Sequence, residues 1–456
     1  MSNMLNIGMS GIYASQAALN VTSNNIANAA VPGYSRQQVM LESSMHGPYG
    51  GGVSVTGVRR IADQYLVEQV WTSQTTASYY ETQASYYGQV EQVFGADGSN
   101  ISTGLDSLFA ALNASLLAPD DIATRQAVLN EASNLSLRFN SIDDGLQTQL
   151  NQIESQMGAS VSQANVYLNQ ISRLNAEVKS FGGLDGTPPE LLDERDNAIA
   201  ELSKLMDVTV TDNADGTINL SLQQGQPLVV GTSAAELKYS PDPTNPEIGQ
   251  VSLDFGDQKF PLNDEMGGSM GALLEYRDDS LAESQKFIDE LAVAIADEMN
   301  AVFAAGTDLN GNPPTLDLFT YDPSNPAGTL KVSDGFTADM LAFGKDGTPG
   351  DNSNLQDAID LANKPIHFAS LGVDATMGQA YATKLGQLGS ESAQAKMDAQ
   401  SSGQSLLRAQ TEWASSSGVN LDEEAVNLIV YQQAYQANSK VISTADQLFQ
   451  SVLNAF

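Results

Sequence analysis

The residues of this sequence that could carry out chemistry are few and scattered. Its two histidines are His46, beside the GPYGGG stretch at 47–52, and His367, which follows Lys364-Pro365. Neither histidine belongs to a GxSxG motif, an HExxH motif or a metal-binding histidine pair. GPYGGG also lacks the Lys-Ser/Thr pair of a phosphate-binding loop. The sequence therefore predicts no catalytic residue and no cofactor site.

A calcium-binding loop is the second kind of functional site that the sequence could contain. The run Asp212-Asn213-Ala214-Asp215-Gly216 begins like such a loop, but alanine occupies a ligand position and the closing bidentate glutamate is absent. Asp-Gly between alternating apolar and polar residues is instead typical of a β-hairpin turn. The chain contains no cysteine, which excludes disulfides and thiolate ligands. We expect no metal site and no enzyme.

Charge is distributed unevenly along the 456 residues. The chain has 55 acidic and 20 basic residues, a net charge of −35, which disfavours binding to nucleic acid and to anionic membranes. Charged residues make up 16% of the chain, yet the first 35 residues carry none and residues 425–456 carry only Lys440 and Asp446. The start lacks the features of a cleavable secretory signal, and no apolar stretch is long enough to span a bilayer. The uncharged ends must therefore meet an environment that differs from that of the middle.

The first segment predicts an amphipathic helix that stops at Pro32-Gly33. Its apolar stripe follows a loose seven-residue repeat with polar intrusions. The stripe consists of Leu5, Met9, Ile12, Leu19 and Ile26.

The last segment carries the clearest pattern in the chain. Its apolar residues recur at alternating spacings of three and four, which indicates a helix with one long apolar face. The stripe consists of Leu428, Tyr431, Tyr435, Asn438, Ile442, Ala445, Phe449, Val452 and Phe456. Asn420 and Glu423 predict a helix cap of the capping-box type, which explains the acidic triplet 422–424 better than a metal site does.

The opposite face of this last helix carries amides and hydroxyls in place of charges. A helix exposed to water usually carries charges there, whereas a helix enclosed by protein avoids them because an unpaired buried charge is costly. We therefore interpret the two stripes as assembly interfaces that neighbouring protein encloses. The alternative is that these Gln-, Asn- and Ser-rich ends are disordered tails, which the stripes disfavour.

The middle of the chain is predicted to be mostly helical. Periodicity indicates helices at 60–94, 103–117, 121–181, 188–206, 269–305 and from 374 onwards, with a break at 415–418. Thr187 and Glu190 predict a second capping box, with proline at the first helical position.

The predicted fold class is mainly α and elongated: a long helical rod with a small antiparallel β unit and coiled-coil-like terminal helices. The expected division is a terminal helical assembly segment (1–59 and 415–456), a central helical rod domain (60–206 and 263–414), a β unit within it (207–262) and an irregular excursion (306–365).

The terminal motifs carry a family resemblance. SGIYASQAALNVTSNNIANAAVPGYSRQ at 10–37 and SGVNLDEEAVNLIVYQQAYQANSKVISTADQLF at 417–449 resemble the ends of the bacterial flagellar hook-associated protein 1 family, the hook–filament junction proteins. NNIAN alone is shared by axial proteins of rod, hook and junction, whereas GYSRQ together with SGVNLDEE is more specific. LLDERDNAIAELSKLMDVTV and the run from GALLEYRD to AGTDLNGN are similar to the family's central helices and adjoining loop. Many members carry a β-rich outer domain after that loop, so its reduction or absence is expected in this chain.

The resemblance implies a structural component of the flagellum that is exported unfolded by the flagellar type III system and assembles in a ring through paired terminal helices. The implied partners are further copies of the chain, the hook protein, the second junction protein (hook-associated protein 3) and a cytoplasmic export chaperone at the C-terminal helix. The implied location is the flagellum outside the cell, after a transient cytoplasmic stage. Two alternatives remain: another axial protein of hook or distal rod, and a secreted enzyme.

Overall fold

The computed structural model describes residues 2–44, 51–246, 248–348 and 350–454. His46, most of the GPYGGG stretch and Phe456 therefore lie outside the described residues. No helix within the described part of the chain combines the length and the apolarity needed to cross a membrane.

The chain forms two compact units. The first unit comprises Met1–Tyr79, Ala159–Gly271 and Gln400–Phe456, and the second comprises Tyr80–Gly158 and Ala272–Ala399.

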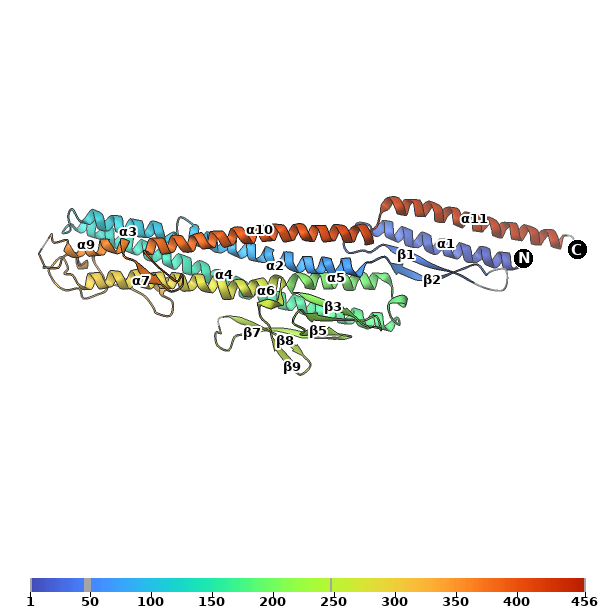
Figure 1. Ribbon diagram of the computed structural model, residues 1–456, viewed down its shortest axis with the longest axis horizontal. Helices are drawn as coiled ribbons and strands as arrows, with labels where there is room; N and C mark the ends of the chain where they lie inside the picture. The colour runs from blue at the N-terminus through green and yellow to red at the C-terminus, as the bar shows by residue number, and fades with distance from the viewer. Residues whose placement is uncertain (1, 45–50, 247, 349, 455–456) are drawn as a thin grey trace. The chain divides into compact units, whose positions relative to one another are not determined.

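Helices dominate both units (Figure 1). They are α1 (Ser2–Asn28), α2 (Gln64–Gly95), α3 (Ile101–Ser115), α4 (Ile122–Ser180), α5 (Pro189–Leu205), α6 (Gly268–Tyr276), α7 (Ala282–Ala304), α8 (Pro326–Thr329), α9 (Ser353–Asp360), α10 (Met377–Ser417) and α11 (Leu421–Leu453). A π-helical turn, Arg277–Leu281, joins α6 to α7.

The strands form small antiparallel sheets. They are β1 (Gln37–Ser43), β2 (Val53–Arg60), β3 (Val208–Asp212), β4 (Ile218–Leu222), β5 (Pro227–Val230), β6 (Ser233–Ala234), β7 (Glu236–Pro241), β8 (Gly249–Phe255), β9 (Gln258–Pro261), β10 (Phe319–Thr320), β11 (Lys331–Val332), β12 (Ile366–Phe368) and β13 (Val373–Ala375). The sheet orders are β3-β4-β5-β6 and β7-β8-β9, with β1-β2, β10-β11 and β12-β13 as two-stranded ribbons. The predicted fold class, mainly helical with a small antiparallel β unit, is confirmed.

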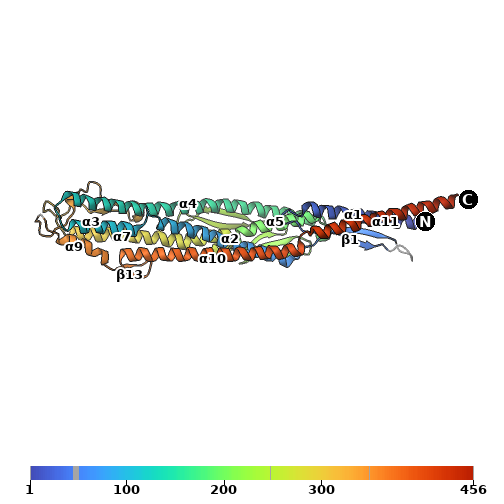
Figure 2. The same cartoon turned by 90° about the horizontal axis from the view of Figure 1, so that it is seen from above.

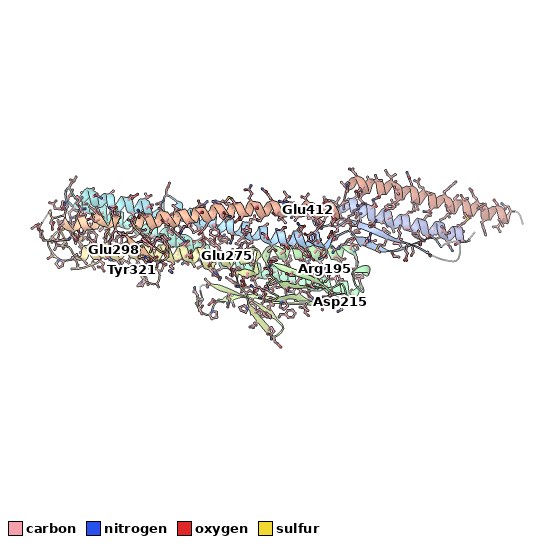
Figure 3. All side chains as sticks on the ribbon, in the orientation of Figure 1. Arg195, Asp215, Glu275, Glu298, Tyr321 and Glu412 are labelled. Atoms are coloured by element: carbon pink, nitrogen blue, oxygen red, sulfur yellow. The ribbon has the colours of Figure 1, made fainter. Side chains whose placement is uncertain are left out.

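The first unit holds the β3–β4 hairpin with side chains from neighbouring helices. Arg195 on α5 donates through Nη1 to the Gly216 carbonyl at 2.9 Å, and Figure 3 labels Arg195 together with Asp215. One Asp215 carboxylate oxygen accepts from the Thr217 hydroxyl at 2.6 Å, and the other lies 3.2 Å from Lys179 Nζ. Gly216 has a φ of +80°, a backbone conformation that residues with a side chain rarely adopt. The run weighed above as a calcium loop thus forms the predicted hairpin turn.

The second unit anchors its irregular segment through a buried arginine. Arg125, in the first turn of α4, is 3% exposed. Its guanidinium donates to the carbonyls of Pro119 and Leu341, each at 2.6 Å, and lies 4.4 Å from the ring centre of Phe343. Burial lowers the pKa of Arg125, partly offset by the nearby acidic residues. The loop at 341–343 is therefore fixed to the start of α4.

One local prediction differs from the structure, and one strand was not predicted. The predicted capping box at Thr187 is wrong, because Pro188 occupies the N-cap position and the Thr187 hydroxyl donates to the Gly183 carbonyl at 2.9 Å. β1 was not predicted from the sequence, because Gln37–Ser43 is short and mostly exposed. β1 is a strand because it pairs with β2, and its own sequence does not show a strand pattern.

Candidate assembly interface

α1 and α11 lie side by side and run antiparallel (Figures 1 and 2). A Cβ placed on Gly8 would lie 2.8 Å from Ile442 Cγ1, and one placed on Gly11 would lie 2.5 Å from Asn438 Cγ. The two helices therefore approach too closely for larger residues at these positions. We call this line of contact between α1 and α11 the seam. The face of α1 that is buried or half-buried along this seam consists of Gly8, Gly11, Ser15, Ala18, Thr22 and Asn25.

The predicted stripe of α1 flanks this seam. Leu5, Ile12 and Leu19 are half-buried, whereas Met9 is 46% exposed and Ile26 is 38% exposed. Spacings of three and four are shared by the seam and the stripe, but the seam is made of small and polar residues. A prediction based on hydrophobicity alone therefore selected the face of α1 next to the seam instead of the seam itself.

The predicted stripe of α11 divides into two parts. Leu428, Tyr431 and Ile442 are half-buried, consistent with a position along α1. Tyr435, Phe449 and Val452 remain exposed, with exposed fractions of 40%, 48% and 42%. Phe456 lies outside the described residues, and Asn438 and Ala445 complete the seam.

A second apolar row on α11 was missed by sequence reasoning. Its side chains are between 38% and 60% exposed: Val426, Ile429, Val430, Val441 and Leu448. They could have been found by plotting apolar residues around the whole helix, because most of them lie beside the amide-rich face. The β1–β2 ribbon adjoins α1 and adds exposed Met40, Leu41 and Val55.

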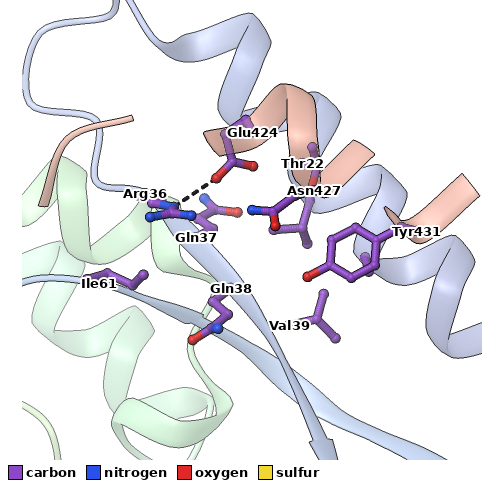
Figure 4. Close-up of a pocket in the computed structure, with 11 residues that line it drawn as sticks. Thr22, Arg36, Gln37, Gln38, Val39, Ile61, Glu424, Asn427 and Tyr431 are labelled. Atoms are coloured by element: carbon purple, nitrogen blue, oxygen red, sulfur yellow. Dashed lines mark hydrogen bonds and ion pairs between the residues drawn. The ribbon is translucent and has the colours of Figure 1, made fainter. Parts of the chain in front are cut away.

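The start of α11 is capped and tied to the other end of the chain. The Asn420 side chain accepts from the N–H groups of Asp422 at 3.0 Å and Glu423 at 3.4 Å. The Glu423 carboxylate lies 2.8 Å from Arg36 Nη1, so this side chain pairs across segments. Glu424, whose side chain is 2% exposed, accepts from Arg36 Nε at 2.8 Å (Figure 4).

Asn25 joins these charges to β1. Its amide nitrogen donates to the Gln37 carbonyl at 2.9 Å and to Glu424 at 3.2 Å, and its amide oxygen accepts from Gln37 N–H at 2.9 Å. The Tyr34 hydroxyl also donates to Asn25 Oδ1, at 3.0 Å. Burial, with nearby Glu190 and other carboxylates, raises the pKa of Tyr34 to about 12. NNIAN, GYSRQ and SGVNLDEE thus meet at one polar cluster.

A pocket of about 100 Å³ lies beside this cluster, lined by residues of α1, β1 and α11 (Figure 4). Thr22, Gln38 and Tyr431 are among its lining residues. The pocket thus lies at the start of α11, beside the bond between Arg36 and Glu424. His367, in contrast, lies on the exposed β12–β13 ribbon, with Nδ1 2.7 Å from Asp374 Oδ1.

Family models match three parts of the chain. The model described as "Flagellar hook-associated protein FlgK helical domain" matches residues 87–319. "Flagellar basal body rod FlgEFG protein C-terminal" matches residues 411–455, and "Flagella basal body rod protein" matches residues 5–34. The terminal matches coincide with the α1–α11 pair, and the central match covers most of the body helices.

Curated relatives match along the full length. The chain is 30% identical to flagellar hook-associated protein 1 of Salmonella typhimurium over 556 aligned positions, which cover all of both chains. These positions exceed the 456 residues of this chain by 100, so parts of the relative have no counterpart in it. Identity to flagellar hook-associated protein 1 of Bacillus subtilis is 28%, covering 97% of this chain and 96% of the relative.

The fold is similar to that of the flagellar hook junction protein FlgK from Burkholderia pseudomallei. The TM-score is 0.65 at 17% sequence identity, and the superposition covers 77% of this chain and all of the other.

Proposed function

Because the chain belongs to the flagellar hook-associated protein 1 family and is a structural component of the flagellum, we propose that it forms the junction between hook and filament. In this role the subunits assemble into a ring through their terminal helices. The proposal includes no catalytic activity and no cofactor.

The observation that carries the proposal is the unused apolar surface of the α1–α11 pair. On α1 the seam is formed by small and polar residues, while on α11 Tyr435, Phe449 and Val452 and the second apolar row stay exposed. Isolated exposed apolar residues are ordinary, but rows of them along two paired helices mark an interaction surface. The absence of charge on α1 and its scarcity on α11 after the first turn support an enclosed position in the assembled state.

The proposed assembly residues are those of the two predicted stripes, which the paired terminal helix or neighbouring subunits would cover: Leu5, Met9, Ile12, Leu19, Ile26, Leu428, Tyr431, Tyr435, Ile442, Phe449, Val452 and Phe456. Asn420 and Glu423 define the start of the C-terminal helix. The domain division given above, with 1–59 and 415–456 as the assembly segment, belongs to the same proposal.

The proposed partners follow from the family. They are further copies of the chain, the hook protein on one side, the second junction protein on the other, and before export a cytoplasmic chaperone that binds α11. An amphipathic helix such as α11 offers the anchors that a helix-in-groove complex needs. We further propose export through the flagellar type III system and a final position at the hook–filament junction.

Deletion of the gene followed by electron microscopy of the cell surface tests the role. We expect hooks without filaments, with flagellin lost to the medium, and restoration of filaments by the full-length gene. Cells that lack the gene but carry normal filaments would contradict the proposal. Cells without hooks would instead favour a hook or rod role.

A further inference from the structure

The connection between α10 and α11 is held by one residue from the opposite end of the chain. The Arg36 N–H donates to the Ser417 carbonyl at 2.8 Å, and the Arg36 carbonyl accepts from the Ile61 N–H at 2.7 Å. The Arg36 guanidinium bonds the buried Glu424 in the first turn of α11. Arg36 therefore contacts both sides of the break at 418–420.

α5 binds the segment that carries Arg36. The Asp193 carboxylate accepts from the Ser35 N–H at 3.0 Å. Gly33 has a φ of +76°, and a Cβ added there would lie 1.9 Å from Asn197 Oδ1. Asp193 and Asn197 are one helical turn apart and lie on the same face of α5. Residues 33–37 thus rest on a face of α5 where a larger residue than Gly33 would collide.

The end of β2 is fixed to the same face. Arg60 Nη1 lies 3.2 Å from Asp193 Oδ1 and also bonds Asp196. The Gln37 side-chain amide donates to Glu190 Oε1 at 3.0 Å, so β1 is held as well. Asp193 therefore receives one bond from the segment before β1 and one from the end of β2.

Each buried charge of this cluster has its partner in a different segment. The side chains of Glu424, Asp193 and Arg60 are 2%, 8% and 13% exposed. Removing one partner of such a pair leaves the other charge buried and unpaired, which is strongly destabilising. The start of α11, residues 33–37 and the end of β2 consequently depend on one another for satisfied partners.

We propose that these residues form a hinge lock that couples the docking of the two chain ends: Asn25, Ser35, Arg36, Arg60, Asp193 and Glu424. In this proposal α11 keeps its orientation relative to the end of α10 only while residues 33–37 are bound to α5. The coupling is a property of the free subunit. Its consequence for assembly rests on the proposed function, because a subunit with an open lock presents no paired helices to its neighbours.

Hydrogen exchange on the full-length subunit tests the coupling with Arg60→Gln. Arg60 bonds α5, whereas the readout is the first two turns of α11, residues 421–428. A local structural role would speed exchange in β2 and α5 alone. We expect protection in 421–428 to fall by about tenfold or more, since local opening there becomes easier. Arg59→Gln is the matched control, because Arg59 is exposed and bonds Gln38 at 3.1 Å, and it should leave 421–428 unchanged.

The lock is wrong if Arg60→Gln speeds exchange in β2 and α5 and leaves 421–428 as protected as before. Glu424→Gln gives a second test that does not require the Arg60→Gln variant to fold. It should speed exchange in residues 33–37, whereas Glu423→Gln should not, because the Glu423 side chain is 57% exposed. Equal effects of the two glutamine variants would also overturn the proposal.

Filament growth separates this proposal from the junction role. If Arg60→Gln opens 421–428 and cells carrying it make fewer filaments than cells carrying Arg59→Gln, the lock contributes to assembly. If both variants leave exchange in α11 and filament number unchanged in a strain that needs this gene for filaments, the junction role stands and the lock fails. If the gene is dispensable for filaments while exchange shows the coupling, the lock stands and the junction role fails.

Discussion

α4 and α11 carry the same spacing of apolar residues and use it in opposite ways. Along α4 the stripe is filled within the chain, with exposed fractions of 0–1% for Val128, Ala132, Leu135, Phe139, Ile142 and Leu146. On α11, Phe449 is 48% exposed and Val430 is 52% exposed. Spacings of three and four therefore predict a helix with an interface but do not say which molecule supplies the other half.

Charge is the sequence feature that separates the two helices. α4 carries charged residues along its length, from Arg125 to Lys179, whereas α11 carries only Lys440 and Asp446 after its first turn. Charges on the outer face are favourable for a helix that stays in water and costly for one that becomes enclosed. A helix whose stripe is exposed and whose other face is uncharged is therefore suited to burial from several sides.

The largest expected effect comes from truncating equivalent aromatic residues in the two stripes. Phe139→Ala removes a side chain with 0% exposure and should lower the free energy of unfolding by about 3–5 kcal/mol. Phe449→Ala should change it by less than about 0.5 kcal/mol, since the ring is half in solvent. Urea unfolding of the two purified variants measures both. Similar losses of stability for the two variants would mean that the stripe of α11 is already packed in the free subunit. The contrast between α4 and α11 would then be wrong.

Much of this architecture could be predicted because local pattern decides it. The long helices, the Asp215-Gly216 hairpin and the start of α11 at Asn420 follow from periodicity and from turn and cap residues close in sequence. The α1–α11 seam could not be predicted in this way, because Gly8 and Gly11 carry no hydrophobic signal and matter only through the opposing helix. The same is true of the cluster around Arg36, whose partner Glu424 on α11 lies 388 positions away.

The glycine seam gives the next largest effect. Gly11→Ala should lower the local stability of the terminal pair by about 1–3 kcal/mol, because the new methyl group would collide with Asn438. Gly403→Ala is the control, since Gly403 is helical and has open space around it, and it should stabilise by about 0.5–1 kcal/mol through helix propensity. Hydrogen exchange in α1 and α11 reports the effect of Gly11→Ala, and exchange in α10 reports that of Gly403→Ala. Stabilisation by Gly11→Ala would show that the two helices are not in close contact at this seam.

Acidic groups in the two units should respond to pH with opposite sign. Burial raises the pKa of Asp196 above the ordinary aspartate value, so its contribution to stability increases as pH falls through that raised pKa. Backbone N–H donors from Lys345 and Ser353 hold the pKa of Asp351 well below its usual range, so its contribution is lost as pH falls. As pH falls below about 7, wild type should therefore gain stability relative to Asp196→Asn. Its advantage over Asp351→Asn should begin to shrink as pH falls below about 5. Urea unfolding at these pH values measures both trends, and parallel trends would contradict the assigned burial.

The smallest effect on the free subunit should accompany a clear effect on assembly. Val430 is 52% exposed on the second apolar row of α11, and Val430→Asn keeps the helix while placing an amide where a neighbour would pack. The free energy of unfolding should change by less than about 0.5 kcal/mol, as expected for a surface site. In the assembled state the same amide would be buried without a hydrogen-bond partner, at a cost of about 1–3 kcal/mol in every subunit of a ring.

Gln433→Asn, on an exposed position of the same helix, is the control, because an amide already occupies that site. Rescue of filament growth in cells lacking the gene compares the two variants. Full rescue by Val430→Asn would remove this row from the assembly surface and leave the predicted stripe of Tyr435, Phe449 and Val452 as its remaining candidate, whereas failure of both variants would mean that the whole outer face of α11 must be matched by its neighbours.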